Sequence, residues 1–204
     1  MRAKICGITT LDDAMLAAQQ GAWAVGFNFY QQSPRYVQPA HAKEIIKKLP
    51  KSVMKIGIFI DYSSCEIFRH VDEVGLDLIQ IYSPIHASQA LQKRMILCLQ
   101  AASQSELPEP EVLQSYGYLL LDAPRHSDGL LGGTGRQSNW ILAQSLAKQH
   151  RLILAGGLTA ENVAAAIQSV NPYAVDVASG IECRPGLKQA DRMTQFLERC
   201  NHVS

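Results

Sequence analysis

RLILAGGLT at residues 151–159 contains the structural unit that repeats along this chain. The apolar residues of 151–155 form a nearly continuous run, which is typical of a strand buried on both faces of a parallel sheet. A glycine pair follows, and Thr159 is a suitable N-cap for a helix expected over 159–169. The stretch therefore predicts one strand that leads directly into one helix.

The same unit recurs from end to end. Strands are expected at 3–6, 24–29, 55–60, 77–82, 94–99, 117–122, 151–155 and 174–179. Helices are expected at 10–20, 39–48, 63–74, 86–92, 109–115, 139–149, 159–169 and 188–200. Eight such units predict an α/β fold, a single-domain (β/α)8 TIM barrel over residues 1–204. A doubly wound open sheet is the alternative that the pattern leaves open.

Composition agrees with one folded domain. The chain has 204 residues, of which 47% are hydrophobic and 18% charged, so it can bury a core. Its net charge of +1 offers no electrostatic attraction to nucleic acid or an anionic membrane. Neither a secretory leader nor an apolar run of membrane-spanning length is visible. We expect a cytoplasmic monomer or homodimer with no nucleic-acid or membrane partner.

Reactive groups are expected where the strands end, because parallel barrels carry their active sites there. The eight ends offer Cys6, Asn28, Asp61, Tyr82, Gln100, Asp122, Gly156-Gly157 and Ser179-Gly180. Cys6 could be a base or nucleophile whose pKa is lowered by the following helix N-terminus, or a small core residue. Asp122 ends a run of three leucines, where burial would raise its pKa and suit a general acid. A helix cap or a loop salt bridge is the other interpretation of Asp122.

Two of these ends suit a phosphate. Gly156-Gly157 and Ser179-Gly180 follow strands seven and eight, where barrels often bind phosphate on free backbone N–H groups. The alternative is an ordinary tight turn at each place. Arg35 follows strand two, and its planar guanidinium suits a substrate carboxylate, although surface arginines are common.

Other patterns are less specific or absent. The glycine-rich segment 123–138 follows Asp122 and is long for a compact domain, so we expect a lid over the site or else a surface loop. No lysine stands at a strand's C-terminal end, which argues against a Schiff-base enzyme. The five cysteines form no C-x-x-C, and the six histidines are scattered. We therefore expect reduced thiols, no metal and no cofactor.

Seven stretches in this order resemble the phosphoribosylanthranilate isomerase family. They are KICGIT at 4–9, GFNF with SPRYV within 26–37, KIGIF at 55–59, LLLDA at 119–123, GGTGR at 132–136, LAGGLTAENV at 154–163 and VDVASGIE at 175–182. Together they span nearly the whole chain and are specific, although no single one is.

The resemblance implies an Amadori rearrangement of N-(5-phosphoribosyl)anthranilate, an aminoaldose, to a 1-amino-1-deoxyketose phosphate. It implies that Asp122 protonates the ring oxygen and that Cys6 removes the proton from C2′. Arg35 would hold the anthranilate carboxylate, and the backbone at Gly156, Gly157, Ser179 and Gly180 would hold the phosphate. Gln80 and Asp176 carry over as pocket residues.

One departure from the family pattern lies in the pocket. The family's usual histidine after strand four is replaced by Tyr82. This substitution is the only support for a second hypothesis, a non-catalytic barrel that binds a sugar phosphate. A third hypothesis is a broader isomerase with a second phosphate site. The residues after strand three, Asp61-Tyr62-Ser63, contain no glycine and argue against it.

Overall fold

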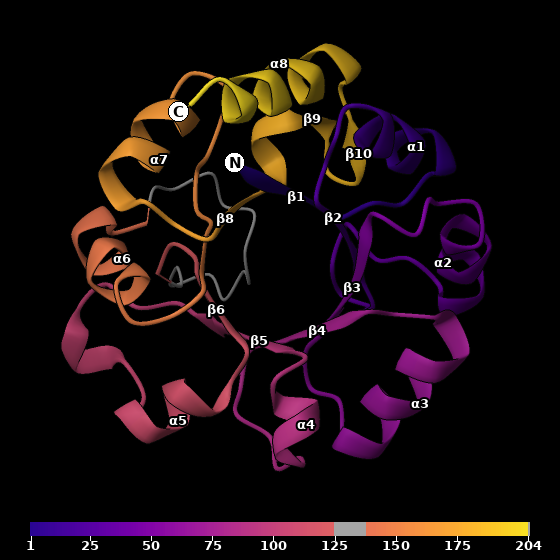
Figure 1. Ribbon diagram of the computed structural model, residues 1–204. Helices are drawn as coiled ribbons and strands as arrows, with labels where there is room; N and C mark the ends of the chain where they lie inside the picture. The colour runs from indigo at the N-terminus through magenta and orange to yellow at the C-terminus, as the bar shows by residue number, and fades with distance from the viewer. Residues whose placement is uncertain (125–137, 204) are drawn as a thin grey trace.

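Strand pairing closes the sheet of this protein into a ring. The computed structural model describes residues 1–124 and 138–203, and in them eight parallel strands pair in sequence order from β1 to β8. Strand β8 returns to pair with β1, so that Lys4 lies in register with Asp176. Figure 1 shows the helices arranged outside this ring. The predicted TIM barrel is confirmed, because an open sheet would lack the pairing of β1 with β8.

All eight predicted strands are present, with ends that differ by up to two residues. They are β1 Arg2–Cys6, β2 Ala24–Asn28, β3 Met54–Phe59, β4 Leu78–Ile81, β5 Met95–Leu99, β6 Tyr118–Leu121, β7 Leu152–Leu154 and β8 Ala174–Val177. The part of the chain that the structure describes has eight α-helices: α1 Leu11–Gln19, α2 Pro39–Ile46, α3 Ser64–Val74, α4 Gln89–Gln92, α5 Pro110–Ser115, α6 Trp140–Ala147, α7 Val163–Val170 and α8 Ala190–Asn201. Two short 3-10 helices occupy Gln104–Glu106 and Ser179–Ile181.

Alternation along each strand separates the interior of the barrel from the layer under the helices. On β1, Ala3 and Ile5 belong to the large apolar cluster that includes the buried faces of the helices. Lys4 belongs to the opposite face, since successive side chains of a strand alternate. Apolar side chains from other strands fill that interior, among them Ile56, Ile96 and Leu120. The strands are buried on both faces, as their continuous apolar runs predicted.

Local sequence sets several helix starts. The Thr10 side chain accepts a hydrogen bond from the backbone N–H of Asp13 and caps the start of α1. Ser63 and Glu66 form a complete capping box at α3. The predicted cap at Thr159 is wrong. Helix α7 begins only after Asn162, whose side chain accepts from the Thr159 N–H and so makes a turn of the residues before the helix.

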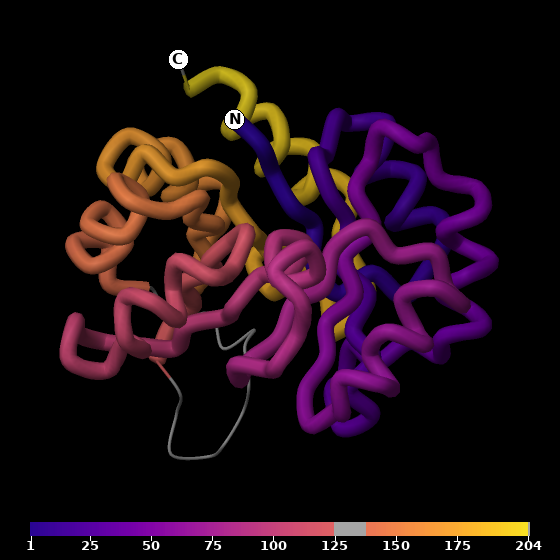
Figure 2. Tube along the Cα trace, turned by 60° about the horizontal axis from the view of Figure 1, so that its bottom comes forward, coloured from indigo at the N-terminus to yellow at the C-terminus, as the bar shows by residue number. Residues whose placement is uncertain are grey.

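A hairpin after β8 was not predicted. Strands β9 (Glu182–Arg184) and β10 (Leu187–Lys188) pair antiparallel and separate the barrel from α8. Figures 1 and 2 show this last helix, in yellow, beside the indigo N-terminal part of the chain. The hairpin thus lies where the two ends of the barrel sequence meet, next to Cys6 at the end of β1.

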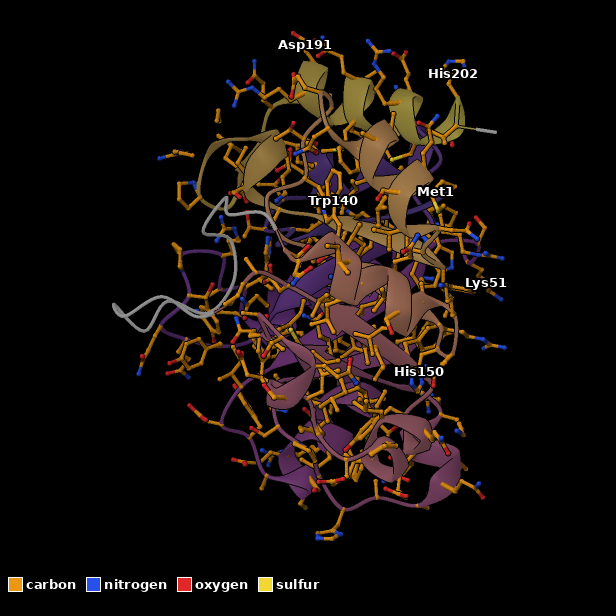
Figure 3. The ribbon with its side chains drawn as sticks, turned by 90° about the vertical axis from the view of Figure 1, so that its left-hand side faces the viewer. Met1, Lys51, Trp140, His150, Asp191 and His202 are labelled. Atoms are coloured by element: carbon orange, nitrogen blue, oxygen red, sulfur yellow. The ribbon has the colours of Figure 1, made fainter. Side chains whose placement is uncertain are left out.

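The strands all begin on one side of the molecule. Figure 3 shows Met1, Lys51 and His150, which precede β1, β3 and β7, on that side. Trp23, Tyr118 and Tyr173 form a ring cluster there, with centroids 5.5 to 6.3 Å apart. These rings pack against the barrel interior and close this end of it. None of the helices in the described ranges is long and apolar enough to cross a membrane.

Candidate active site

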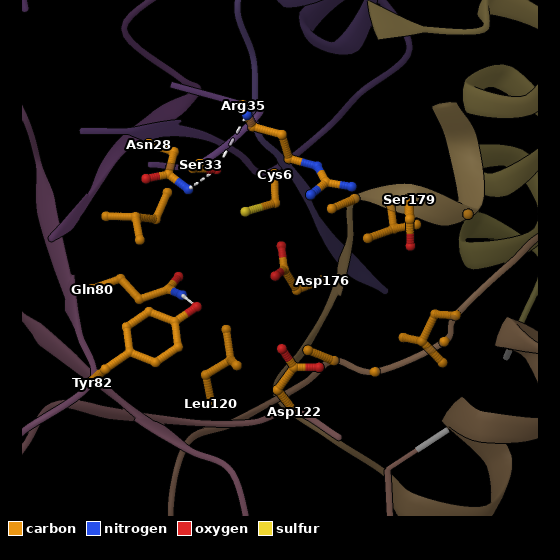
Figure 4. A pocket seen from close by; sticks show the side chains of 18 residues that line it. Cys6, Asn28, Ser33, Arg35, Gln80, Tyr82, Leu120, Asp122, Asp176 and Ser179 are labelled. Atoms are coloured by element: carbon orange, nitrogen blue, oxygen red, sulfur yellow. Dashed lines mark hydrogen bonds between the residues drawn. The ribbon is translucent and has the colours of Figure 1, made fainter. Parts of the chain in front are cut away.

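A pocket lies at the opposite end, where the strands finish (Figure 4). All nine residues proposed from the sequence line it: Cys6, Arg35, Gln80, Asp122, Gly156, Gly157, Asp176, Ser179 and Gly180. Asn28 and Tyr82 line it as well, whereas the strand-end residues Asp61 and Gln100 are not among its lining residues. The parallel strands bring together side chains that are up to 174 positions apart in sequence, from Cys6 to Gly180.

Asp122 is a carboxyl whose pKa lies much closer to neutrality than that of an ordinary aspartate. It follows β6 directly, and one of its oxygens accepts a hydrogen bond of 2.8 Å from the Ala123 N–H. Burial raises the pKa of the Asp122 carboxyl to about 6, and the nearby Asp176 carboxylate contributes in the same direction. The sequence-based expectation of a raised pKa agrees with this environment.

The pKa of the Cys6 thiol is shifted in the opposite direction from the predicted one. The sequence predicts a thiol pKa lowered by the N-terminus of α1. In the structure, burial and the Asp176 carboxylate raise the pKa of the Cys6 thiol above its ordinary value, although Lys4 and Lys188 act against this. The correction has a physical reason, because a thiolate next to a carboxylate in a poorly hydrated pocket loses stability.

A buried ion pair lies beside Cys6. Lys4 Nζ donates to Asp176 Oδ1 at 2.9 Å, and the Lys4 side chain is completely inaccessible to solvent. Figure 4 shows the Asp176 carboxylate between the Cys6 thiol and the Asp122 carboxylate. The negative charge of Asp176 therefore acts on both groups, and it raises the pKa of each. Asp176 was predicted as a pocket residue, but its pairing with Lys4 was not.

Arg35 is held in place by a carboxylate from the hairpin. Its Nε and Nη2 donate to the Glu182 carboxylate at 2.8 to 3.2 Å, a two-pronged contact. Lys188 Nζ binds the same carboxylate at 2.7 Å and also donates to the backbone oxygen of Cys6. Gly7 has a φ of +74°, and a Cβ there would lie 2.6 Å from Arg35 Cδ. The loop after β1 must therefore carry a glycine where the arginine crosses it.

The two glycine-containing loops fit closely against each other. A Cβ at Gly180 would lie 2.0 Å from the Leu158 backbone oxygen, so the loop after β8 touches the loop after β7. Gly156 and Gly157 have φ values of +88° and +62°, which favour glycine. Asn162 Nδ2 donates to the Gly157 oxygen at 2.8 Å and fixes the turn. Both loops border the pocket, as the sequence predicted, although β7 ends one residue and β8 two residues earlier than expected.

Gln80 and Tyr82 form the wall from β4. Gln80 is buried, its Nε2 lies 3.5 Å from the Tyr82 hydroxyl, and its Oε1 has no hydrogen-bond partner in the described part of the chain. An unpaired buried carbonyl of this kind is costly unless a ligand donates to it. Residues 125–137 of the predicted lid, including GGTGR, lie outside the described residues.

Sequence reasoning missed three charged side chains that lie beside Cys6 or Arg35, namely Lys4, Glu182 and Lys188. A signal existed for Lys4, since residues two apart on a strand share a face. Glu182 and Lys188 gave no such signal, because the hairpin of residues 182–188 brings them beside Arg35. No cluster of three or more His, Cys, Asp or Glu side chains suited to a metal occurs in residues 1–124 and 138–203.

Comparison with known proteins identifies the same family along the whole chain. The family model of N-(5′-phosphoribosyl)anthranilate isomerase matches residues 3–199. The N-(5′-phosphoribosyl)anthranilate isomerase of Pelobacter propionicus is 43% identical over 200 residues, which cover 97% of this chain and 94% of that protein.

Solved structures agree. The phosphoribosylanthranilate isomerase of Thermus thermophilus superposes with a TM-score of 0.87 at 33% identity and covers both chains completely. A second isomerase structure, solved with reduced 1-(o-carboxyphenylamino)-1-deoxyribulose 5-phosphate, has a TM-score of 0.84 at 33% identity over 98% of each chain. With this fold, this pocket and these full-length relatives, the chain belongs to the N-(5′-phosphoribosyl)anthranilate isomerase family.

Proposed function

We propose that Cys6 and Asp122 are the base and the acid with which this phosphoribosylanthranilate isomerase works in tryptophan biosynthesis. The enzyme converts N-(5′-phosphoribosyl)anthranilate to 1-(2-carboxyphenylamino)-1-deoxyribulose 5-phosphate. The observation that supports these roles is the placement of one thiol and one raised-pKa carboxyl in the same pocket. An aldose-to-ketose rearrangement needs one group of each kind.

The proposed reaction has two proton transfers. Asp122 donates its proton to the furanose ring oxygen while the bond from that oxygen to C1′ breaks, which gives an open-chain protonated imine. Cys6, as the thiolate, then removes the proton from C2′, and the electron pair moves to the imine to form an enolamine. Tautomerisation of the enolamine gives the ketone. Each group is expected to contribute roughly 10²–10⁴ in rate, and the reaction requires no cofactor or metal.

The substrate's two anionic groups are assigned to opposite sides of this pair. Arg35 would bind the anthranilate carboxylate, since its Nη1 makes no hydrogen bond to the described residues while Glu182 holds the rest of the guanidinium. Backbone N–H groups around Gly156, Gly157, Ser179 and Gly180 would bind the phosphate. The phosphate is remote from the bonds that change, so its binding energy would orient the sugar.

Gln80 and Asp176 would contact the sugar and anthranilate region between these anchors. The unpaired Gln80 Oε1 suits a substrate hydroxyl or N–H donor. The relative solved with a reduced phosphorylated ligand supports a small phosphorylated molecule as the partner of this pocket.

A coupled assay tests the function. Phosphoribosylanthranilate is generated in situ from anthranilate and phosphoribosyl pyrophosphate by a separate transferase, and its fluorescence decay is followed with and without EDTA. We expect decay faster than spontaneous hydrolysis, unaffected by EDTA and lost in Cys6→Ala. Decay no faster than hydrolysis would instead support a binding barrel, with Tyr82→His the first variant to restore activity.

We also propose that the enzyme works in the cytoplasm as a monomer or homodimer. All five cysteines are free in the structure, and a base thiol must remain reduced. Light scattering of the purified protein measures the assembly, and cell fractionation measures the compartment. A disulfide at Cys6 in protein isolated under non-reducing conditions would contradict the compartment.

A further inference from the structure

Lys4 is a buried cation that the two proton transfers do not use. Taking an ammonium group out of water costs several kcal/mol unless it is paired, and well-packed apolar side chains often replace such pairs without loss of stability. The other strands fill the same barrel interior with Ile56, Ile96, Leu120 and Ile153. Packing of the interior therefore does not require a charge at position 4, and the Lys4 charge calls for another explanation.

Strand geometry places this cation next to Cys6. Lys4 and Cys6 are two residues apart on β1, so their side chains leave the same face of the strand. Gly26 on β2 is the register partner of Cys6. A Cβ at Gly26 would lie 3.3 Å from both Lys4 Cε and Cys6 Sγ. The two side chains meet in the space that this glycine leaves.

We propose that Lys4 and Asp176 together set the ionisation of the Cys6 thiol. The Lys4 ammonium stabilises the thiolate, the Asp176 carboxylate opposes it, and the ion pair between them fixes both charges. Both act as positioning residues, since their effect passes through Cys6. The idea deepens the proposed function, because it concerns the base of that reaction.

The charges around Cys6 support a cationic role for Lys4. Burial alone would lower the pKa of Lys4, but Asp176 and Cys6 raise it above its ordinary value, so the amine stays protonated and is no nucleophile. The charged and titratable groups that face Cys6 are Lys4 of β1, Asp176 of β8, Lys188 of β10, and Arg35, Tyr82 and Asp122 of the pocket. Lys188 is held by Glu182, whereas Lys4 is held by Asp176, which itself acts on the thiol.

The test measures the thiolate directly. Iodoacetamide alkylates the ionised sulfur, forming a carbon–sulfur bond with loss of iodide, and peptide mass spectrometry gives the rate at Cys6 as a function of pH. Asp176→Asn should move the titration midpoint of Cys6 to lower pH, and Lys4→Met should move it to higher pH, each by about one pH unit or more. At neutral pH the two variants should then differ about a hundredfold in alkylation rate. Lys4→Arg should stay near the parent protein.

Opposite shifts distinguish this proposal from a structural role. A purely structural ion pair would give equal, same-direction or no shifts in the two variants, and any of these results would overturn the proposal. The exposed Cys65 in the same digests is the internal control for the reagent. Far-UV circular dichroism checks the fold of each variant.

A double variant allows the role of Lys4 to be tested even if Lys4→Met alone does not fold. Lys4→Met leaves Asp176 buried without a partner, so the protein could unfold. Lys4→Met with Asp176→Asn removes both charges and differs from Asp176→Asn only by the ammonium. Its midpoint must therefore lie above that of Asp176→Asn, and equal midpoints would refute a role for Lys4. Alkylation requires no turnover, so the result stands even if the assigned isomerase roles fail.

Discussion

The two ends of the barrel interior bury different kinds of side chain, aromatic at one end and charged at the other. Where the strands begin, Trp23, Tyr118 and Tyr173 close the interior, and the Arg2 guanidinium lies 4.4 Å from the Tyr173 ring centroid. Where the strands finish, the interior contains Lys4 and Asp176 beside the thiol of Cys6. One end buries apolar surface, and the other buries charge.

The contrast separates stability from chemistry within one sheet. Aromatic rings that pack in tilted or edge-to-face pairs, as these three do, gain free energy from burial and from the ring contacts themselves. Buried charges lose hydration, which shifts the pKa values of their neighbours and creates an acid near neutral pH. Substitutions at the finishing end should therefore change rates, and substitutions at the starting end should change the free energy of unfolding.

The largest effect is expected at the proposed acid and base. Cys6→Ala and Asp122→Asn should each lower kcat at least about a hundredfold, because each removes one proton transfer, while leaving the unfolding free energy almost unchanged. The coupled fluorescence assay and urea unfolding measure the two quantities. Cys65→Ala and Asp61→Asn are matched controls, since they make the same changes outside the pocket. Near-full activity in a pocket variant would remove that residue from its role.

At the end where the strands begin, Trp23→Ala should lower the unfolding free energy and leave kcat almost unchanged, the reverse of what we expect for the Cys6 and Asp122 variants. Losing a partly buried indole that contacts two other rings should lower the unfolding free energy by about 2 kcal/mol. The value of kcat at 25 °C should stay within about twofold, because the cluster lies at the far end of the barrel from the pocket. Urea unfolding and the assay decide between these outcomes. A large fall in kcat with intact stability would show that the two ends are coupled.

The arginine anchor should give a smaller effect on substrate affinity. Of all these variants, Arg35→Ala should raise KM most. We expect a rise of at least about tenfold, because the variant removes a charged hydrogen-bond donor. Glu182→Gln should raise KM less, since Arg35 remains but loses its ionic partner. Steady-state kinetics for both variants measure the split between KM and kcat. An unchanged KM in Arg35→Ala would exclude the carboxylate role.

The smallest change is expected in kcat/KM as the pH varies between the pKa of Asp122 and the pKa of Cys6. The active form needs protonated Asp122 and ionised Cys6, although the pKa of Asp122 is about 6 and that of Cys6 is above its ordinary value. Between these two pKa values, each unit rise in pH increases the thiolate fraction of Cys6 tenfold and decreases the protonated fraction of Asp122 tenfold. The two changes cancel, so kcat/KM should stay flat. Below about pH 6 it should fall tenfold per unit, because Asp122 is already protonated and thiolate continues to be lost.

Asp122→Asn provides the matched control for that profile. Without the titrating acid, the residual kcat/KM should rise through the neutral range up to the pKa of Cys6. A flat profile in this variant would show that the break near pH 6 belongs to another group.

Local patterns were sufficient for the architecture and for most of the pocket. Apolar runs followed by caps predicted eight strand–helix units, and the rule that parallel barrels react at their strand ends selected Cys6, Asp122 and the glycine loops. The start of α7 was misplaced because Thr159 and Asn162 are both good caps and only the turn geometry distinguishes them. The hairpin of Glu182 and Lys188 was missed because its strands have three and two residues and no apolar periodicity.

The spacing of residues near one another in the chain established the βα units, the groups at the strand ends and the raised pKa of an aspartate after three leucines. Those features depend on neighbours within a few positions, which fix backbone conformation and burial. The direction of the Cys6 pKa shift was decided by Asp176, and the pose of Arg35 by Glu182, 147 positions away. Such contacts exist only once β8 closes on β1, since the register of that closure, and no local propensity, brings the Lys4 ammonium to the Asp176 carboxylate.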